Sequence, residues 1–223
     1  MKVSYIHHSS FLVETDRFYY LFDYASGTLP EMDVTKPILV LSSHSHADHY
    51  NAEIFSLLDT LGMQNVQAIL SDDIVVPVNI QTLRVSPEKE YDLGLQQKLT
   101  TLRSTDLGVA FLIEDQENLI YHAVDLNDWV WDEESNSCNE EMTANYQKQI
   151  CLLAEKLNHK EVDVAFVVLD PRQGKDYDRG LCFFLENISS EQVYPMHYWD
   201  KAEIIEAFLK DHPQYQFQIQ KTE

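Results

Sequence analysis

Three histidines and an aspartate occur within the segment 44–49, whose sequence is HSHADH. In an extended chain alternate side chains project to the same side, so His44 and His46 would face one way. A turn after His46 would let Asp48 and His49 point into the same cavity. Imidazole and carboxylate groups are the ligands that Zn²⁺, Fe²⁺ and Mn²⁺ prefer in proteins. The segment therefore predicts a metal site, and this one loop could supply two sets of ligands.

The elements on either side of this segment would hold it in place. The apolar run at 38–41 predicts a buried strand before it. After it, apolar residues at helical spacing predict a helix that begins with Asn51 as its N-cap and ends before Gly62. Loops at the carboxyl ends of strands are where α/β sheets place their sites. A solvated histidine-rich loop is the alternative, but such a loop is rarely set between a buried strand and a helix.

The rest of the chain predicts short strands with helices between them. Strands are expected at 3–6, 11–14, 18–22, 67–70, 81–85, 98–102, 109–113, 119–123, 164–169, 192–194 and 215–219, and helices at 140–157 and 202–209. No stretch is rich enough in glycine, proline or serine to be a linker, so a single domain over 1–223 is expected. This order of elements predicts an α/β fold of two sheets between helices.

One internal similarity is visible along the chain. The tetrapeptide FLVE at 11–14 leads into a strand ending at Asp23, and FLIE at 111–114 leads into a strand ending at Asp125, an offset of 111 − 11 = 100 residues. Two hairpins of ordinary composition could share such a match by chance. Otherwise the domain consists of two related α/β halves that face each other, with loops from both converging at one edge.

The composition argues against several classes of function. Lysine and arginine number 16 against 37 aspartates and glutamates, so the net charge is 16 − 37 = −21. A field of this sign repels nucleic-acid backbones and anionic membrane surfaces. The longest apolar run, 164–169, is too short to cross a bilayer. The amino terminus has no secretory leader pattern, so a cytoplasmic location is expected.

The cysteines give a further constraint on metal binding. Cys138, Cys151 and Cys182 are widely spaced and form no CxxC pair. This pattern argues for reduced thiols and against a thiolate metal site. Any metal is therefore expected to be held by histidine and carboxylate groups.

The segment 44–49 resembles the HxHxDH motif of the metallo-β-lactamase superfamily, and further similarity extends over most of the chain. HSSFL at 8–12 resembles the opening strand turn of the lactonase-like branch of that superfamily. IYHAVDLN at 120–127 is similar to the strand that ends in a metal-bridging aspartate, and PMHYW at 195–199 is similar to the last metal-ligand strand. The resemblance implies a four-layer αββα sandwich of the metallo-β-lactamase type.

The resemblance also implies a set of metal ligands. It places His44 and His46 at a first metal, Asp48, His49 and His197 at a second, and Asp125 as a bridge between both. Without the motif, Asp125 could be an ordinary turn residue and His197 a packed core residue. The remaining histidines carry weaker signals: His8 and His122 are expected behind the ligands or in the core, and His7, His159 and His212 are expected to be bystanders.

The sequence departs from this family at two positions. Most members carry a further histidine at the first metal, but Ser104 stands at that place, and Asp106 could supply an oxygen only if the loop turns inward. Val124 stands where the motif has glycine, so a different backbone conformation is expected there. A hydroxyl is a weaker donor than an imidazole. The second site should therefore fill first, giving a mononuclear or unevenly occupied centre.

These features predict a metal-dependent hydrolase. A divalent ion bound by imidazoles and carboxylates lowers the pKa of water from about 16 towards about 7, which makes hydroxide available at neutral pH. Asp48 or Asp125 would orient that water or shuttle a proton. We expect one or two ions, with zinc first and manganese or iron as alternatives. The expected substrate is a small ester, lactone, amide or phosphoester.

Substrate recognition has a weaker signature. The predicted loop at 170–179 holds three of the 16 basic residues, Arg172, Lys175 and Arg179. Arg172 or Lys175 could clamp an anionic group of the substrate, or the charges of the loop could pair internally. Trp129 and Trp131 could form one wall of a pocket or simply cover the core.

Two other functions fit the same residues. One is a non-hydrolytic iron protein with redox or dioxygen chemistry, and the other is a degenerate metal-binding sensor without turnover. Metal identity separates the first from a hydrolase, and absence of turnover despite bound metal indicates the second. A small molecule is the expected partner in each case, with no nucleic acid and no membrane, and the sequence makes no prediction of oligomeric state.

Overall fold

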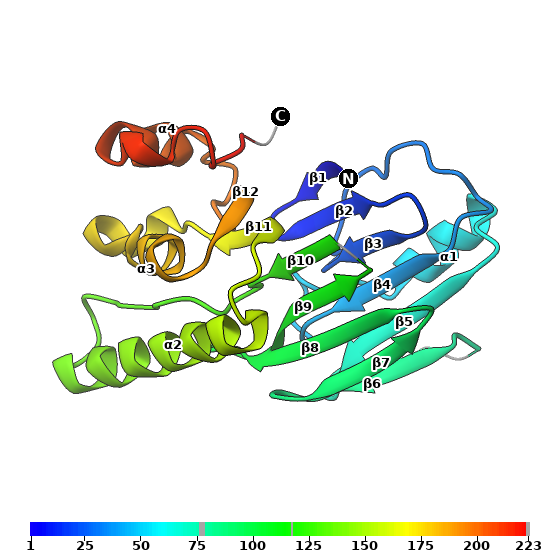
Figure 1. Cartoon of the computed structure of the whole chain (residues 1–223), viewed down its shortest axis with the longest axis horizontal. Helices are drawn as coiled ribbons and strands as arrows, with labels where there is room; N and C mark the ends of the chain where they lie inside the picture. The colour runs from blue at the N-terminus through cyan, green and yellow to red at the C-terminus, as the bar shows by residue number, and fades with distance from the viewer. Residues whose placement is uncertain (76–78, 117, 222–223) are drawn as a thin grey trace. The chain divides into compact units, whose positions relative to one another are not determined.

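The computed structural model describes residues 1–75, 79–116 and 118–221. The chain forms two compact units, a first unit at Met1–Ser86 and a second unit that begins at Pro87. Each unit is built on one six-stranded mixed sheet with its own helices (Figure 1). Among the described residues, none of the helices has the length and apolar character needed to span a membrane.

The sheet of the first unit changes from antiparallel to parallel pairing. Its strands follow one another in sequence order: β1 (Lys2–His7), β2 (Ser10–Glu14), β3 (Tyr19–Phe22), β4 (Ile38–Ser42), β5 (Val66–Ser71) and β6 (Thr82–Val85). Strands β1 to β3 pair antiparallel, and β3 to β6 pair parallel. Because β3 and β4 run the same way, the loops after Phe22 and Ser42 leave the sheet at the same edge.

A hydrophobic core fixes these strands and the helix that follows the HSHADH segment. Helix α1 (Glu53–Thr60) buries Ile54 and Leu58, which join Ile38 and Val40 of β4 in one cluster. Burial of such an aliphatic side chain contributes about 1.5–3 kcal/mol relative to exposure. The loop between β4 and α1 is therefore anchored at both ends.

The sheet of the second unit has the order β12-β11-β10-β9-β8-β7. Its strands are β7 (Glu90–Gly94), β8 (Gln97–Arg103), β9 (Val109–Asp115), β10 (Asn118–His122), β11 (Val162–Val168) and β12 (Ser190–Met196). Its helices are α2 (Asn136–Leu157), η1 (Pro171–Asp176), α3 (Arg179–Asn187), α4 (Glu203–Asp211) and η2 (Pro213–Tyr215). Helix α2 contacts β8 and α3 contacts β11, so these two helices lie along this sheet (Figure 1).

The same succession of strand directions occurs in both units. Strands β1 to β5 form two antiparallel pairs followed by two parallel pairs, and β8 to β12 do the same. The tetrapeptides at 11–14 and 111–114 lie in the second strand of each succession, β2 and β9. The internal similarity therefore has a counterpart in the strand order of each unit.

Some expected elements are wrong or incomplete. The alternation at 215–219 is not a strand: η2 ends at Tyr215, and Phe217 is 88% exposed. Asn51 is not the N-cap of α1, which is Ala52, although the Asn51 side chain accepts a hydrogen bond from the Glu53 N–H. The predicted loop at 170–179 contains η1 and the first residue of α3, and β7 was not predicted.

Candidate metal centre

The first unit positions two histidines of the HSHADH segment through one carboxylate. Asp23 follows β3 and is fully buried. Its Oδ2 lies 2.8 Å from His49 Nδ1 and accepts a hydrogen bond of 2.8 Å from Ser43 Oγ. Ser43 Oγ in turn lies 2.8 Å from His44 Nδ1. In this network both histidines donate from Nδ1, so the Nε2 atoms of His44 and His49 carry the lone pairs that a metal ion would use.

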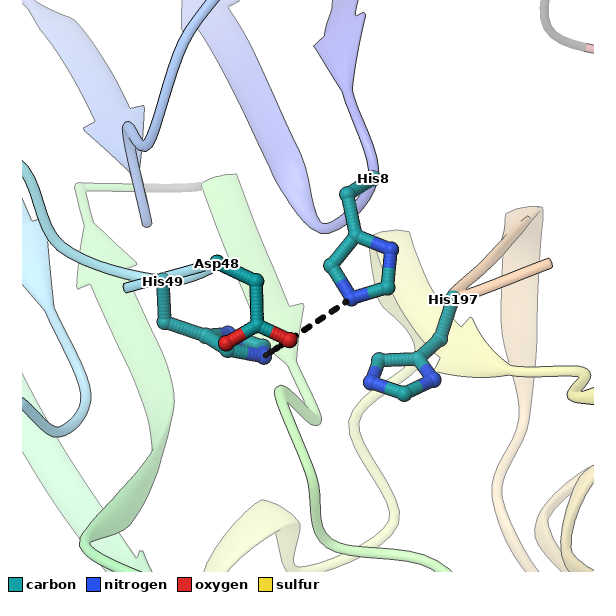
Figure 2. Close-up of side chains that lie close together, drawn as sticks. All are labelled: His8, Asp48, His49 and His197. Atoms are coloured by element: carbon teal, nitrogen blue, oxygen red, sulfur yellow. Dashed lines mark ion pairs between the residues drawn. The ribbon is translucent and has the colours of Figure 1, made fainter. Parts of the chain in front are cut away.

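Three side chains of the first unit bring ligand atoms together (Figure 2). Oδ2 of Asp48 lies 3.7 Å from His8 Nε2 and 3.9 Å from His49 Nε2. Zinc bonds of about 2.0–2.3 Å at tetrahedral angles place ligand atoms roughly 3.3–3.6 Å apart. These three atoms are therefore close to the spacing that a single ion requires.

The two other histidines of the segment lie beside this group. The His44 ring centroid is 4.3 Å from that of His49 and 4.5 Å from that of His46. His44 and His49 are fully buried, His46 is exposed, and the Asp48 side chain is 39% exposed. The segment thus offers buried imidazoles for binding and one carboxylate that water can reach.

The second unit pairs the other two predicted ligands. Nε2 of His197 lies 3.4 Å from Oδ1 of Asp125, and Nδ1 of His197 lies 2.9 Å from Oδ2 of Asp170. Asp170 is fully buried and also accepts hydrogen bonds from the Arg172 guanidinium. Burial alone would raise the pKa of the Asp170 carboxyl, but the hydrogen bonds from His197 and Arg172 outweigh it and hold the pKa well below its usual range. A charged carboxylate therefore fixes His197 as Asp23 fixes His49.

Tryptophan side chains surround His197. The ring centroids of Trp129 and Trp199 lie 5.4 Å and 5.5 Å from that of His197. The Trp129 indole donates to the backbone carbonyl of Asp125 at 2.9 Å. Trp131 stacks on Trp129 with centroids 5.9 Å apart, and the Arg172 guanidinium lies 4.5 Å from the Trp199 ring centroid. Trp129 therefore packs against both predicted ligands, and Trp131 stacks behind it. A role for the two rings as a pocket wall stays a prediction.

The region of the missing histidine offers a carboxylate. Ser104 is buried, and its Oγ accepts a hydrogen bond from the Asp106 N–H at 3.1 Å. A carboxylate oxygen of Asp106 lies within 4.8 Å of one of Asp125. The loop thus brings Asp106 near Asp125, and replacement of the histidine by Asp106 stays a prediction.

Val124 has a left-handed backbone conformation. Its φ is +54°, and its side chain is fully buried. Packing therefore holds the valine in a region that β-branched residues avoid. A backbone conformation different from that of the glycine in the motif stays a prediction. The Val124 N–H also donates to His122 Nδ1 at 3.2 Å, so His122 is a buried residue that supports this turn.

The basic residues at 172–179 pair with acidic neighbours of the second unit. Arg172 binds Asp170, Lys175 lies 2.6 Å from Asp132, and Arg179 lies 3.1 Å from Asp128. The internal pairing that the sequence left open is therefore present. Lys175 and Arg179 line a groove of about 470 Å³ with residues of α2, and Arg172 does not. A substrate-binding role for Arg172 and Lys175 stays a prediction.

Sequence reasoning assigned no site role to Asp23 or Asp170, and it predicted His8 behind the ligands or in the core. Asp23 and Asp170 carried one usable signal, since each follows a buried strand at its carboxyl end. His8 lies in the turn between β1 and β2, where the sequence resembled the lactonase-like opening turn. It is 5% exposed and belongs to the ligand group of the first unit.

Comparison with known proteins identifies the fold. No family model and no curated protein matches the sequence. Among solved structures, Igni18, a metallo hydrolase from the archaeon Ignicoccus hospitalis, is similar over 99% of this chain and 94% of its own, with 16% identity and a TM-score of 0.65. YhfI from Bacillus subtilis, described as a metallo-β-lactamase fold protein, matches over 96% of this chain and 90% of its own, with 14% identity and a TM-score of 0.61. The chain has the metallo-β-lactamase fold.

The metallo-β-lactamase fold is shared with proteins of more than one named activity. CmlA from Streptomyces venezuelae, a diiron β-hydroxylase, matches over 97% of this chain and 52% of its own, with 12% identity and a TM-score of 0.60. The predicted α/β class and the predicted superfamily fold are confirmed by the two mixed sheets and these similarities. The lactonase-like branch stays a prediction.

Proposed function

We propose that the chain is a metal-dependent hydrolase that acts on a small ester, lactone or phosphoester. The observation that carries the proposal is the buried network of Asp23, Ser43, His44 and His49. A carboxylate behind a histidine fixes its tautomer and its ring orientation and raises its basicity as a ligand. Burying a carboxylate costs free energy unless the charge is paired or hydrogen-bonded. Asp23 is hydrogen-bonded to Ser43 and His49.

The donor groups fit a divalent cation. His49 and His197 are each oriented from Nδ1, and a carboxylate, of Asp48 or Asp125, lies beside the Nε2 atom of each. Imidazole with carboxylate suits zinc first, and also manganese or iron. When bound, such an ion lowers the pKa of water towards about 7 and polarises the carbonyl or phosphoryl oxygen of a substrate. The motif predicts that six residues form one centre: His44, His46, Asp48, His49, Asp125 and His197.

The side chains of this protein have distinct tasks in the proposed reaction. Asp48 is the most exposed carboxylate of the predicted ligands, so its Oδ2 is accessible to accept a proton from water or to orient it. His8 Nε2, 3.7 Å from that oxygen, would be a further ligand for the same ion. Asp23 and Asp170 fix the orientation of the imidazoles. Rigid ligands would keep the reacting groups in the geometry that the reaction needs.

Iron-dependent redox chemistry is the second candidate function. It is favoured by the similarity to CmlA, a diiron hydroxylase with the same fold. Exposed His46 and Asp106 could serve iron as well as zinc, because both metals accept nitrogen and oxygen donors. The donor types alone do not separate the two candidates, so the metal and the reaction must be measured.

The deciding experiment combines metal analysis with a substrate panel. The protein as purified is analysed for zinc, manganese and iron, and then tested against lactones, carboxylic esters and phosphodiesters. We expect zinc or manganese and hydrolysis of at least one class, with a loss of 10²-fold or more in Asp48→Asn. The matched control is Asp59→Asn, an exposed aspartate on α1. Iron with a redox-active absorption band, together with no hydrolysis, would overturn the proposal.

A further inference from the structure

We propose a second metal site in the second unit, formed by Asp178, Cys182 and His212, with zinc as its ion. This site contains none of the ligands assigned to the candidate hydrolytic centre. One ligand atom from each residue lies within 4.8 Å of the others. The sequence argued against a thiolate site because no two cysteines are close in the chain, but here one cysteine meets a histidine 30 residues away.

One of the two distances from His212 Nε2 is close to the spacing around an ion, and the other is a hydrogen bond that must lengthen. His212 Nε2 lies 2.8 Å from Asp178 Oδ2 and 3.7 Å from Cys182 Sγ. Bonds of about 2.0 Å to nitrogen and oxygen and about 2.3 Å to sulfur, at tetrahedral angles, place such atoms roughly 3.3–3.6 Å apart. A shift of about half an ångström between His212 and Asp178 would therefore admit the ion.

The geometry favours a metal site over a nucleophile with its base. In a cysteine–histidine–aspartate triad the thiol and the carboxylate contact opposite nitrogens of the imidazole. Here both contact the same nitrogen, Nε2 of His212. A proton relay through the ring is therefore not built, whereas convergence of sulfur, nitrogen and oxygen on one point is what an ion requires.

The backbone holds each of the three residues in place. Asp178 is the N-cap residue of α3, and Cys182 lies one turn later, with its N–H donating to the Asp178 carbonyl at 2.8 Å. His212 ends α4, where its N–H donates to the Phe208 carbonyl at 2.8 Å, and its ring packs on the Phe208 ring with centroids 4.6 Å apart. The backbone positions of the three residues are therefore fixed before an ion binds, which lowers the entropic cost of binding.

The surroundings of the thiol are negative. Burial raises the pKa of Cys182 to about 12, and the carboxylates of Asp178 and Glu186 add to the shift. The same carboxylates favour a cation at this place, and a bound zinc ion would displace the thiol proton to solvent. With three protein ligands the fourth position would be held by water. The ion would clip the start of α3 to the end of α4 within the second unit.

Cobalt spectroscopy tests this site without any activity readout. A Cys138→Ser, Cys151→Ser double variant removes the two exposed cysteines and leaves Cys182 as the one thiol of the chain. We expect Co²⁺ to give this variant a thiolate-to-cobalt charge-transfer band that saturates at one ion per chain. The candidate hydrolytic centre contains no cysteine, so it cannot produce the band. Absence of the band at saturating Co²⁺ would overturn the proposal.

Substitution and protection complete the test. Cys182→Ser in the same background must lose the band, and His212→Gln must weaken cobalt binding at least 10-fold. Circular dichroism checks that each variant is folded. In the wild-type chain, which needs no substitution, Zn²⁺ should slow alkylation of Cys182 at least 10-fold and leave the rates at Cys138 and Cys151 unchanged. Equal alkylation rates at Cys182 with and without Zn²⁺ would also overturn the proposal.

Discussion

Asp23 orients two histidines of the HSHADH segment without being one of the predicted ligands. Its two oxygens accept from the Ser43 N–H, the Ser43 hydroxyl and His49 Nδ1, each at 2.8 Å. A single buried charge therefore sets the orientation of His49 directly and of His44 through Ser43. Loss of that charge should affect both imidazoles at once.

We expect Asp23→Asn to weaken metal binding about 10–100-fold, the usual cost of losing a carboxylate behind a ligating histidine. The amide has nearly the same shape but lacks the charge that orients the His49 N–H. Competition with a chromophoric chelator measures the affinity, and circular dichroism checks the fold. Ser43→Ala is the matched comparison, because it disconnects only His44 and should cost less. Equal affinity in Asp23→Asn and wild type would contradict the assignment.

Ser104 and Asp106 determine a second prediction at this scale. In a Cys182→Ser background, which removes the separate thiolate site, we expect the chain to hold fewer than two ions. Ser104→His in that background should raise the stoichiometry towards two, because imidazole is the stronger donor. Since Asp106 lies within 4.8 Å of Asp125, Asp106→Ala should lower it. Elemental analysis after gel filtration gives the values. Two tightly held ions in the Cys182→Ser background, unchanged by Asp106→Ala, would show that neither Ser104 nor Asp106 limits metal binding.

The ligands and the residues behind them differ in how well a sequence can reveal them. The HSHADH residues are adjacent in the chain, so their clustering is visible without a fold. Asp23 meets Ser43 only because β3 and β4 are parallel neighbours, and Asp170 meets His197 only because β11 and β12 are. In both units a carboxylate at the end of one parallel strand supports a histidine after the next. Strand pairing is a long-range property, and apolar runs do not encode it.

Most strands were predictable because buried parallel strands are continuous apolar runs, as at 38–41 and 164–169. The prediction of a strand at 215–219 was wrong. Large residues also alternate in segments where only some of their side chains pack against the core. Ile219 bridges Val193 and is buried, whereas Phe217 is exposed. Helix α3 was not predicted, although its apolar run at 181–185 is visible in the sequence. The predicted loop at 170–179 includes its N-cap Asp178, and Gly180 lies in its first turn, where glycine disfavours a helix.

Lys36 attaches the connection between β3 and β4 to the end of β2. Its Nζ lies 2.7 Å from Glu14 Oε1 and donates to the Thr15 carbonyl at 3.0 Å. The hydrogen bond from Lys36 lowers the pKa of Glu14 below its ordinary value of 4.5. A carboxyl with a lowered pKa in the folded state stabilises the protein above its unfolded pKa, and that contribution is lost as the pH falls through the folded value.

We therefore expect Glu14→Gln to lower the free energy of unfolding at pH near neutral by about 1 kcal/mol or less, since the pair is partly exposed. The difference from wild type should shrink as the pH falls below the ordinary pKa of 4.5. Urea unfolding followed by circular dichroism at neutral and acidic pH measures both. Glu31→Gln, an exposed glutamate of the same unit, is the control. A difference that grows in acid would refute the sign.

At the scale of the whole molecule, the motif predicts that ligands of both units bind the same ion. His49→Ala in the first unit and His197→Ala in the second should then each abolish binding of that ion. The double variant should bind no less metal than either single variant, because a shared ion can be lost only once. His159→Asn, an exposed histidine, is the control. If instead the double variant loses the sum of the metal lost by the two single variants, His49 and His197 belong to two separate sites.

The grouping of indole rings near His197 has a practical consequence. The chain has three tryptophans, and all of them belong to the set formed by Trp129, Trp131, Trp199 and the ligand that they surround. When tryptophan is excited selectively, so that the 12 tyrosines do not contribute, the fluorescence of the protein therefore originates from this one set of rings. A paramagnetic ion such as Co²⁺ at His197 should quench most of it, so the protein carries its own optical sensor for occupancy at that histidine.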